Sequence, residues 1–331
     1  MQPYSTPRHR KINNFPETPM PSTRDHVLRR KRLREAVLGE RPPEQYDAGA
    51  MPLHGIEGSV IEASPHLLVL AAPDGTELRV PISADASIWH AGKAGTSALR
   101  PGRDVIVRPT GGGGLIAERI WVDITRVTGV IAGRTGRVLE IDAGPHRAPT
   151  ALVIPTESMT RIQVRHPRLE PGSLVDVIGV RRAGEIHALR PATNSPQPAS
   201  HAEHPSSDRR SGSVSRVLRG TATWYDRSGT GAAYPAVDPH GDAGGCGMGP
   251  PSPLPVLSIA SELHVRNDCT GRAMRVPIVE CGCVAARFCD RCVRCGTSPR
   301  GRILELTRTA FVDLGGDLDA GCFNVTARVD H

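Results

Sequence analysis

The central part of the chain, residues 55–190, repeats itself at an interval of about 70 residues. The first copy opens GSVIEASPHLLVLAAPDGTELRVPI and the second opens GVIAGRTGRVLEIDAGPHRAPTALVIP. The later halves match better, because ALRPGRDVIVRPTGGGGLIAERIWV lies against RLEPGSLVDVIGVRRAGEIHALRPA. A duplicated pattern of this kind predicts two copies of one small folding unit in tandem.

Each copy reads as about five short strands of alternating character, separated by turns. Both contain a Leu-x-Pro-Gly step, in which proline fixes φ and the following glycine, Gly102 or Gly172, supplies a positive φ. A sheet of so few short strands must curl to bury one face, so each copy predicts a small barrel of OB-like size. The copies are similar to small OB-like domains of bacterial envelope proteins.

Composition supports several small units over one large core. Aromatic residues make up only 3% of the chain, while 35 glycines and 30 prolines favour strands and turns. We therefore expect an all-β protein with two tandem small OB-like β-barrel repeats and a six-stranded C-terminal barrel. The expected segments are a disordered basic tail (1–50), the repeats (52–124 and 125–190), a Pro/Ser-rich linker (191–213) and the C-terminal barrel (214–331).

The N-terminal tail carries much of the formal net charge of +7. Its run 26–40 could form one short helix, and a basic arm could touch nucleic acid or anionic lipid. The run has acidic residues nearby and no interleaved aromatics, so nucleic acid is not an expected partner. No stretch reaches the roughly 18 apolar residues of a membrane span, and the N-terminus lacks the apolar region of a secretory signal.

The C-terminal segment contains a series of ordered motifs. They are GTATWYD, GGCGMG, ASELHVRNDCTGRAMRVPIVE and GRILELTRTAFVDLG. In this order they resemble the double-psi β-barrel of expansins, barwin-like proteins and rare lipoprotein A. The resemblance covers the last third of the chain and implies a polysaccharide-binding groove on that barrel.

The resemblance also implies which residues line the groove. The acidic positions of the family fall on Glu280 and Glu305, and the opening strand brings Thr223 and Tyr225, so these four residues are the expected glycan-binding set. Trp224 and Tyr225 are adjacent in a strand, so one is expected in the core and the other in the groove. Glu305 has a second interpretation, as a structural carboxylate that caps a helix at Thr307.

Two departures from the family argue against catalysis. The family has aspartate at both acidic positions, and one extra methylene can move a general acid out of reach of the glycosidic oxygen. The histidine of the lytic relatives has no clear match, since His264 is misplaced. No residue is therefore predicted to be catalytic, and Glu280 is only a weak candidate.

All eight cysteines follow Gly245 in the sequence. They are Cys246, Cys269, Cys281, Cys283, Cys289, Cys292, Cys295 and Cys322. An even number in a small β-module is typical of a disulfide framework, which the barwin and expansin relatives also have. The alternative is zinc, held by Cys281 or Cys283 with Cys289, Cys292 and Cys295, because the cluster contains C-x2-C steps. Both interpretations stay open on the sequence.

Three functions compete on these observations. The first is a non-hydrolytic polysaccharide-binding protein of the cell envelope or the extracellular space, with cell-wall polysaccharide as its partner and no cofactor. The second is an intracellular, cytoplasmic zinc-binding scaffold or nucleic-acid-associated protein, which the missing signal sequence and the C-x2-C steps favour. The third is a weak lytic transglycosylase that uses Glu280.

Overall fold

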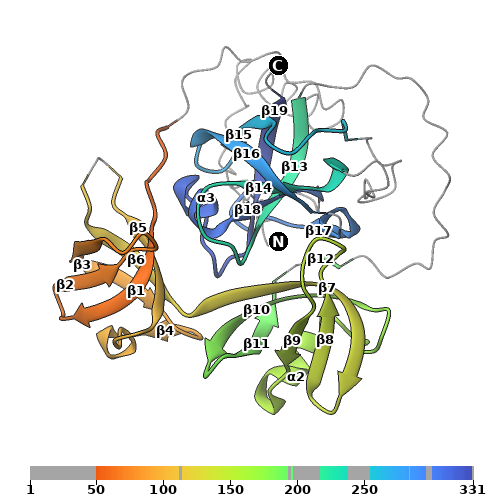
Figure 1. The fold of residues 1–331 in the computed structure, drawn as a ribbon, viewed down its shortest axis with the longest axis horizontal. Coiled ribbons are helices and arrows are strands. Elements are labelled where there is room, and N and C mark those ends of the chain that lie inside the picture. The colour runs from red at the N-terminus through yellow and green to blue at the C-terminus, as the bar shows by residue number, and fades with distance from the viewer. Residues whose placement is uncertain are drawn as a thin grey trace, which may run out of the picture. The chain divides into compact units, whose positions relative to one another are not determined.

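The computed structural model describes residues 50–111, 114–192, 195–196, 217–237, 254–282, 284–295 and 300–329. Nearly all regular structure in these ranges is β-strand, as the sequence predicts (Figure 1). The expected tail and its possible helix at 26–40 lie outside the described residues, as does most of the expected linker. No helix in the described ranges has the length and apolar character that crossing a membrane requires.

The first repeat forms a barrel, coloured orange to yellow in Figure 1. Its elements are β1 (Ile56–Ala63), β2 (Leu67–Ala71), β3 (Glu77–Trp89), β4 (Lys93–Ala94), a 3-10 turn (Thr96–Ala98), β5 (Asp104–Pro109) and β6 (Ala117–Val122). The hydrogen-bonded order β2-β1-β5-β6-β3 closes through a β2–β3 pairing. Only the β3–β6 contact in that ring is parallel.

The second repeat forms a closed barrel of the same design. Its elements are β7 (Ile124–Thr135), β8 (Val138–Asp142), β9 (Thr150–Val153), α2 (Thr156–Gln163), β10 (Leu174–Arg182) and β11 (Glu185–Pro191). The ring runs β10-β11-β9-β8-β7, and β9–β11 is its parallel contact. In both barrels the third strand pairs with the fifth and the first with the fourth, which is the order of an OB fold.

Two features predicted from the repeat are confirmed. Each copy has five barrel strands, and Gly102 and Gly172 have φ values of +80° and +86°, in the left-handed region that the Leu-x-Pro-Gly turn requires. The glycines that open the two copies, Gly58 and Gly129, have another cause. An added Cβ would lie 2.6 Å from the Ala71 carbonyl oxygen at Gly58 and 2.3 Å from the Asp142 carbonyl oxygen at Gly129.

We expect Gly129→Ala to lower the free energy of unfolding by about 1–3 kcal/mol, the usual cost of overpacking. The new methyl group must push β7 away from β8, because the atom that it meets is backbone and cannot rotate aside. Urea denaturation measures the loss. The matched control is Gly95→Ala, where no atom lies within 4 Å of the added Cβ. Equal stability of both variants would contradict this close approach.

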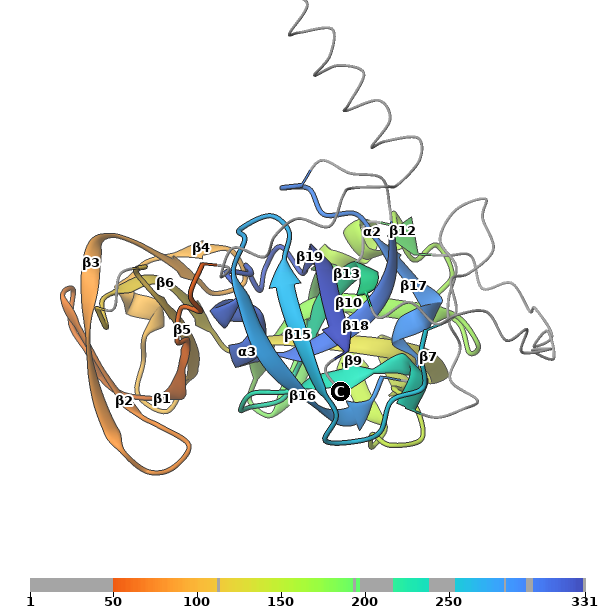
Figure 2. The same cartoon turned by 90° about the horizontal axis from the view of Figure 1, so that it is seen from above.

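The C-terminal segment forms the third barrel, coloured cyan to blue in Figures 1 and 2. Its elements are β12 (Ser195–Pro196), β13 (Val217–Tyr225), β14 (Ala232–Tyr234), a 3-10 turn (Pro235–Val237), β15 (Glu262–Asn267), β16 (Ala273–Cys281), a 3-10 turn (Ala285–Arg287), β17 (Phe288–Asp290), β18 (Arg300–Thr307), α3 (Arg308–Asp313) and β19 (Cys322–Val329). Six of the strands close a mixed barrel in the order β18-β13-β19-β15-β16-β14, while β17 pairs with β18 and β12 pairs with β17. The β13–β18 and β14–β16 pairings are parallel.

The core of the third barrel extends into the first two. Trp224, Phe311 and Phe323 are buried at its centre, and the two phenylalanine rings stack with centroids 4.7 Å apart. The same apolar cluster includes Trp121 of the first barrel and Ile178 of the second. The three barrels in residues 50–329 therefore share buried surface, which the sequence did not predict.

Candidate functional site

The two acidic residues expected in the groove lie in one row across the third barrel. Ala233 on β14 is in register with Glu280 on β16 and with Glu305 on β18. Glu305 is in turn in register with Thr223 on β13. Residues in register on paired strands point to the same side of a sheet, so Glu280, Glu305 and Thr223 share one face.

Tyr225 joins this face, and Trp224 points away from it. Trp224 is fully buried in the barrel core, where its indole Nε1 donates to the Leu318 carbonyl oxygen at 2.8 Å. Tyr225 lies two residues after Thr223, so its ring projects outward beside the row. The division expected between the two aromatic neighbours is therefore the one observed. The structure brings together all four residues of the expected set.

The outward face is covered by the second barrel. Arg147, in the loop between β8 and β9, places its guanidinium carbon 4.5 Å from the centre of the Tyr225 ring. The same guanidinium forms an ion pair with Glu280 Oε1 through Nε and another with Glu305 Oε2 through Nη2, the latter at 3.2 Å. One arginine from another barrel thus contacts three of the four expected groove residues.

Further arginines engage both carboxylates. Arg227 Nη1 donates to the second oxygen of Glu280 at 2.8 Å, and Arg302 Nη1 donates to Glu305 Oε1 at 3.2 Å. Both oxygens of each glutamate therefore face a guanidinium. Glu305 is an ion-pair partner of Arg147 and Arg302, and Thr307, the N-cap residue of α3, makes no side-chain capping hydrogen bond.

Burial and charge set the protonation of the site. Burial raises the pKa of Tyr225 to about 12, and Glu280 adds to the rise, so the phenol stays neutral at ordinary pH. Burial alone would lower the pKa of Arg147, but Glu305 and Glu280 raise it above its usual value. The site is thus a pair of carboxylates and a neutral phenol closed over a permanent cation.

Two hydroxyl groups in the site lack a well-formed hydrogen bond. Thr223 Oγ1 is buried and makes no hydrogen bond with any described residue. The Tyr225 hydroxyl lies near Arg227 but makes no hydrogen bond of acceptable geometry. Buried hydroxyls normally find a partner, so these two mark places where a polar ligand could bind.

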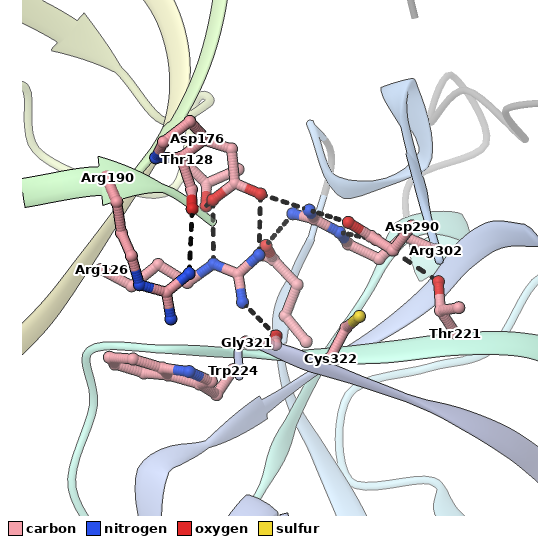
Figure 3. A network of polar contacts seen from close by, with 12 residues as sticks. Arg126, Thr128, Asp176, Arg190, Thr221, Trp224, Asp290, Arg302, Gly321 and Cys322 are labelled. Atoms are coloured by element: carbon pink, nitrogen blue, oxygen red, sulfur yellow. Dashed lines mark hydrogen bonds and ion pairs between the residues drawn. The ribbon is translucent and has the colours of Figure 1, made fainter. Parts of the chain in front are cut away.

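A second cluster of charges fixes the second barrel beside this site (Figure 3). Asp176 on β10 accepts from Arg126 Nη2 at 2.7 Å and from Arg302 Nη2 at 2.5 Å. Arg302 also donates to Asp290 from Nε at 2.9 Å, and Asp290 is near the Thr221 hydroxyl. The four charged side chains are completely buried.

The pKa of Asp176 follows from these partners. Burial by itself would raise it, but Arg126 and Arg302 together lower it far below the usual carboxyl range. Asp176 is therefore ionised at ordinary pH. Because it belongs to the second barrel and Arg302 to the third, this contact also holds β10 and β18 in a fixed relation.

Arg147, Arg126, Asp176 and Arg302 were not identified from the sequence. Arg147 lies in the polar loop sequence GPHRAP, which carries no signal for a buried contact. Asp176 did carry a sequence signal for a buried contact, because it is a charged residue between Val175 and Val177 in the middle of an apolar strand. His264 lies on β15 opposite Arg275, near the start of β16, whereas Glu280 is near its end. It is therefore not part of the row.

The cysteines are in part disulfide-bonded. Cys269 and Cys295 form a disulfide, and Cys281 and Cys289 are each disulfide-bonded as well. Cys292 and Cys322 are free thiols in the described residues, and both are buried. Cys246 and Cys283 lie outside the described residues.

Among the described residues, one group of three cysteine sulfurs lies close together, and it overlaps the expected zinc set only in part. The three sulfurs that lie within 4.8 Å of one another belong to Cys269, Cys292 and Cys295. Cys269 was not in the expected set, and two members of that set, Cys281 and Cys289, are committed to disulfides. Disulfide sulfurs are not thiolates, so this group could hold a metal only after Cys269 and Cys295 were reduced.

The Cys292 sulfur lies 3.5 Å from that of Cys269 and accepts from the Cys295 amide. We expect Cys295→Ser, refolded in an oxidising buffer, to join Cys269 to Cys292 and lose one free thiol relative to the wild type. Mass spectrometry of the alkylated, unreduced protein counts the thiols.

The matched control for this exchange is Cys292→Ser/Cys295→Ser, which leaves Cys269 without its nearest partners. This variant should lose about 3–4 kcal/mol of stability, as expected for a disulfide that closes a loop with a sequence separation of 26 residues. Cys295→Ser should keep most of that stability. A Cys295→Ser protein with more free thiols than the wild type would show that Cys292 cannot take over.

Comparison with known proteins assigns the chain to no family. No protein-family model matches it, and no curated protein matches it. A solved structure of drosophila Unr CSD456 is 16% identical over 53% of this chain and 72% of that chain, with a TM-score of 0.16. A likeness at that TM-score carries no argument about fold or function.

Proposed function

We propose that the protein is a non-hydrolytic polysaccharide-binding protein of the cell envelope or extracellular space. We also propose that its third barrel is a double-psi barrel related to those of expansins and rare lipoprotein A. The mixed six-stranded ring and the four motifs in their order support the barrel type. The meeting of Thr223, Tyr225, Glu280 and Glu305 on one face supports the function.

The contents of this face suit sugar recognition. Sugars are held by a few directed polar groups beside an aromatic surface. The face offers two carboxylates as acceptors, two hydroxyls that lack a well-formed hydrogen bond and one face of the Tyr225 ring. It lies on the outside of the third barrel but under the second, so a sugar can reach it only after the covering loop has moved.

Binding fits the geometry better than cleavage. A general acid must offer a proton from one carboxyl oxygen to the glycosidic oxygen. Both oxygens of Glu280 face arginines, Arg147 and Arg227, and Glu305 is shared between Arg147 and Arg302. We therefore place lytic transglycosylase activity through Glu280 behind binding.

Retention on insoluble polysaccharide tests this function. The wild-type protein is incubated with peptidoglycan, chitin and cellulose, and the bound fraction is measured after washing. We expect retention on at least one of them, and a loss of about tenfold in affinity for Glu280→Gln/Glu305→Gln, because each removed charge weakens a hydrogen bond to the ligand. The matched control is Glu62→Gln, an exposed glutamate of the first barrel. A wild type that is retained on none of the three would contradict the proposal.

The second candidate is the intracellular zinc-binding scaffold. Its supporting observation is the group formed by Cys269, Cys292 and Cys295, whose sulfurs lie within 4.8 Å. If this function holds, the chain purified under reducing conditions carries one zinc ion and releases free thiols on chelation. Absence of zinc in the reduced protein would eliminate it.

A further inference from the structure

The β8–β9 loop reaches the third barrel through one side chain. Pro145, His146 and Ala148 are exposed, and only the Arg147 side chain among these neighbours makes the ion pairs to the carboxylates. Its Nη2 atom is buried and makes no hydrogen bond of good geometry to Glu305. A contact that rests on one incompletely bonded side chain in an otherwise exposed loop can open without unfolding either barrel.

The charges around Arg147 balance only while it is in place. The ion pairs join four arginines to four carboxylates in a continuous series. The members are Arg126, Asp176, Arg302, Asp290, Glu305, Arg147, Glu280 and Arg227. If Arg147 leaves, one carboxylate in a covered site has no matching cation, and buried unpaired charge is strongly unfavourable.

A ligand that replaces Arg147 must therefore bring a positive charge. A neutral sugar would leave the excess carboxylate uncompensated, whereas a sugar with one ammonium group restores the balance. The cage is also shaped for a cation, because two carboxylates flank the face of the Tyr225 ring and aromatic faces attract cations. The unpartnered Thr223 hydroxyl beside Glu305 remains available for a sugar hydroxyl.

We propose that this site binds a glycan with free amino groups, such as a de-N-acetylated amino sugar polymer, and that Arg147 occupies the place of the amino group in the closed protein. This inference rests on the proposed polysaccharide binding. It adds the class of glycan and an intramolecular competitor. The overall charge of +7 makes non-specific attraction of a polycation unfavourable, so retention of such a glycan requires a local acidic site.

The first test examines the closed state without any glycan. Trypsin must take the arginine side chain into its pocket, so the bond between Arg147 and Ala148 should resist cleavage while Arg147 is held by the carboxylates. The control bond joins Arg182 to Ala183 in the exposed β10–β11 turn and has the same residue types. We expect Glu280→Gln/Glu305→Gln to raise cleavage at Arg147 about tenfold, with no change at Arg182.

The cleavage rates decide whether Arg147 closes the site. Cleavage of the wild type at Arg147 as fast as at Arg182 would overturn the closed state. So would an unchanged rate at Arg147 in the double glutamine variant. Both outcomes are independent of polysaccharide binding, so failure of this test is distinguishable from failure of the proposed function.

The second test compares chitosan, which carries free amino groups, with chitin, which does not. We expect the wild type to favour chitosan, and Arg147→Ala to gain about tenfold in affinity for chitosan oligomers because the competitor is gone. Arg147→Lys keeps the charge but not the two-nitrogen contact with Glu280 and Glu305, so its affinity should lie between those of the wild type and Arg147→Ala. Thermal denaturation of each variant shows that it is folded before its binding is compared.

The glycan comparison has two contradicting outcomes. If Arg147→Ala gains the same affinity for chitin as for chitosan, the site does not select amino groups. The second outcome is a wild type that is retained on polysaccharide and an Arg147→Ala variant that gains affinity for neither glycan. In that case Arg147 is not a competitor and the glycan binds elsewhere. Failure of every variant and the wild type to bind any polysaccharide overturns the proposed function together with this ligand class, while the tryptic result still reports on the closed state.

Discussion

Asp176→Asn is expected to lower the free energy of unfolding by about 3–5 kcal/mol, the usual cost of removing one partner from a buried ion pair. The side chains of Arg126, Asp176 and Arg302 have no exposed surface. Asparagine keeps the shape of the aspartate but not its charge, so two guanidinium groups would remain buried next to a neutral amide. Urea denaturation measures the change.

The size of the loss of stability in Asp176→Asn distinguishes a buried ion pair from an ordinary surface ion pair. Asp85→Asn, at an exposed position of the first barrel, is the matched control and should change stability by less than about 0.5 kcal/mol. Adding Arg126→Met to Asp176→Asn should recover part of the loss, since one unpaired charge is then removed. An Asp176→Asn loss below about 1 kcal/mol would show that water reaches the pair.

The same carboxylate makes stability fall in acid. The folded pKa of Asp176 is lowered far below the unfolded value, which is about 3.9 for an aspartate. Its contribution is therefore fully present above that unfolded value and is lost as the pH falls toward the folded pKa. Asp176→Asn should remove this part of the acid dependence, so the difference in stability between variant and wild type should begin to shrink below about pH 4 and keep shrinking as the pH falls further.

Trp224→Ala should lower the free energy of unfolding by about 3–5 kcal/mol, and Tyr225→Phe should change it by less than about 1 kcal/mol. Trp224 fills the barrel core and donates to the Leu318 carbonyl oxygen, so truncation leaves a cavity and an unpaired acceptor. The Tyr225 hydroxyl makes no hydrogen bond of good geometry, and phenylalanine keeps the ring surface under Arg147.

This pair of neighbours separates core from site on one strand. Urea denaturation gives the stabilities, and retention on polysaccharide gives the second readout. Tyr225→Phe should weaken glycan binding with little loss of stability, because it removes a polar group that faces the ligand. A Tyr225→Phe variant as unstable as Trp224→Ala would place both side chains in the core and contradict the site.

The repeats were predictable because their signals are local. A turn such as Pro101-Gly102 fixes its own backbone, and alternation along a strand fixes which side chains share a face. The same local rule explains why Trp224 and Tyr225 could be assigned to opposite faces. The strand order of each barrel was expected only through the likeness to OB-like domains, because five short strands can close in more than one order.

The packing of the barrels was not predictable in the same way. Asp176 and Arg302 are distant in sequence, and their pairing depends on how two folded units meet. The loop that carries Arg147 has the composition of any exposed turn, so nothing in it indicates an ion pair with Glu280 and Glu305. Spacing alone also could not show that Cys269 approaches Cys292 and Cys295, because that contact depends on how the third barrel folds.

Isothermal titration of chitosan oligomers into Arg147→Ala, and into the same variant with Glu280→Gln and Glu305→Gln, shows whether Glu280 and Glu305 bind a cationic sugar in the place that Arg147 takes in the closed protein. We expect the two glutamine substitutions to weaken binding by at least about tenfold, as two lost charge-assisted contacts would. Equal affinities in the two proteins would show that these carboxylates do not hold the sugar.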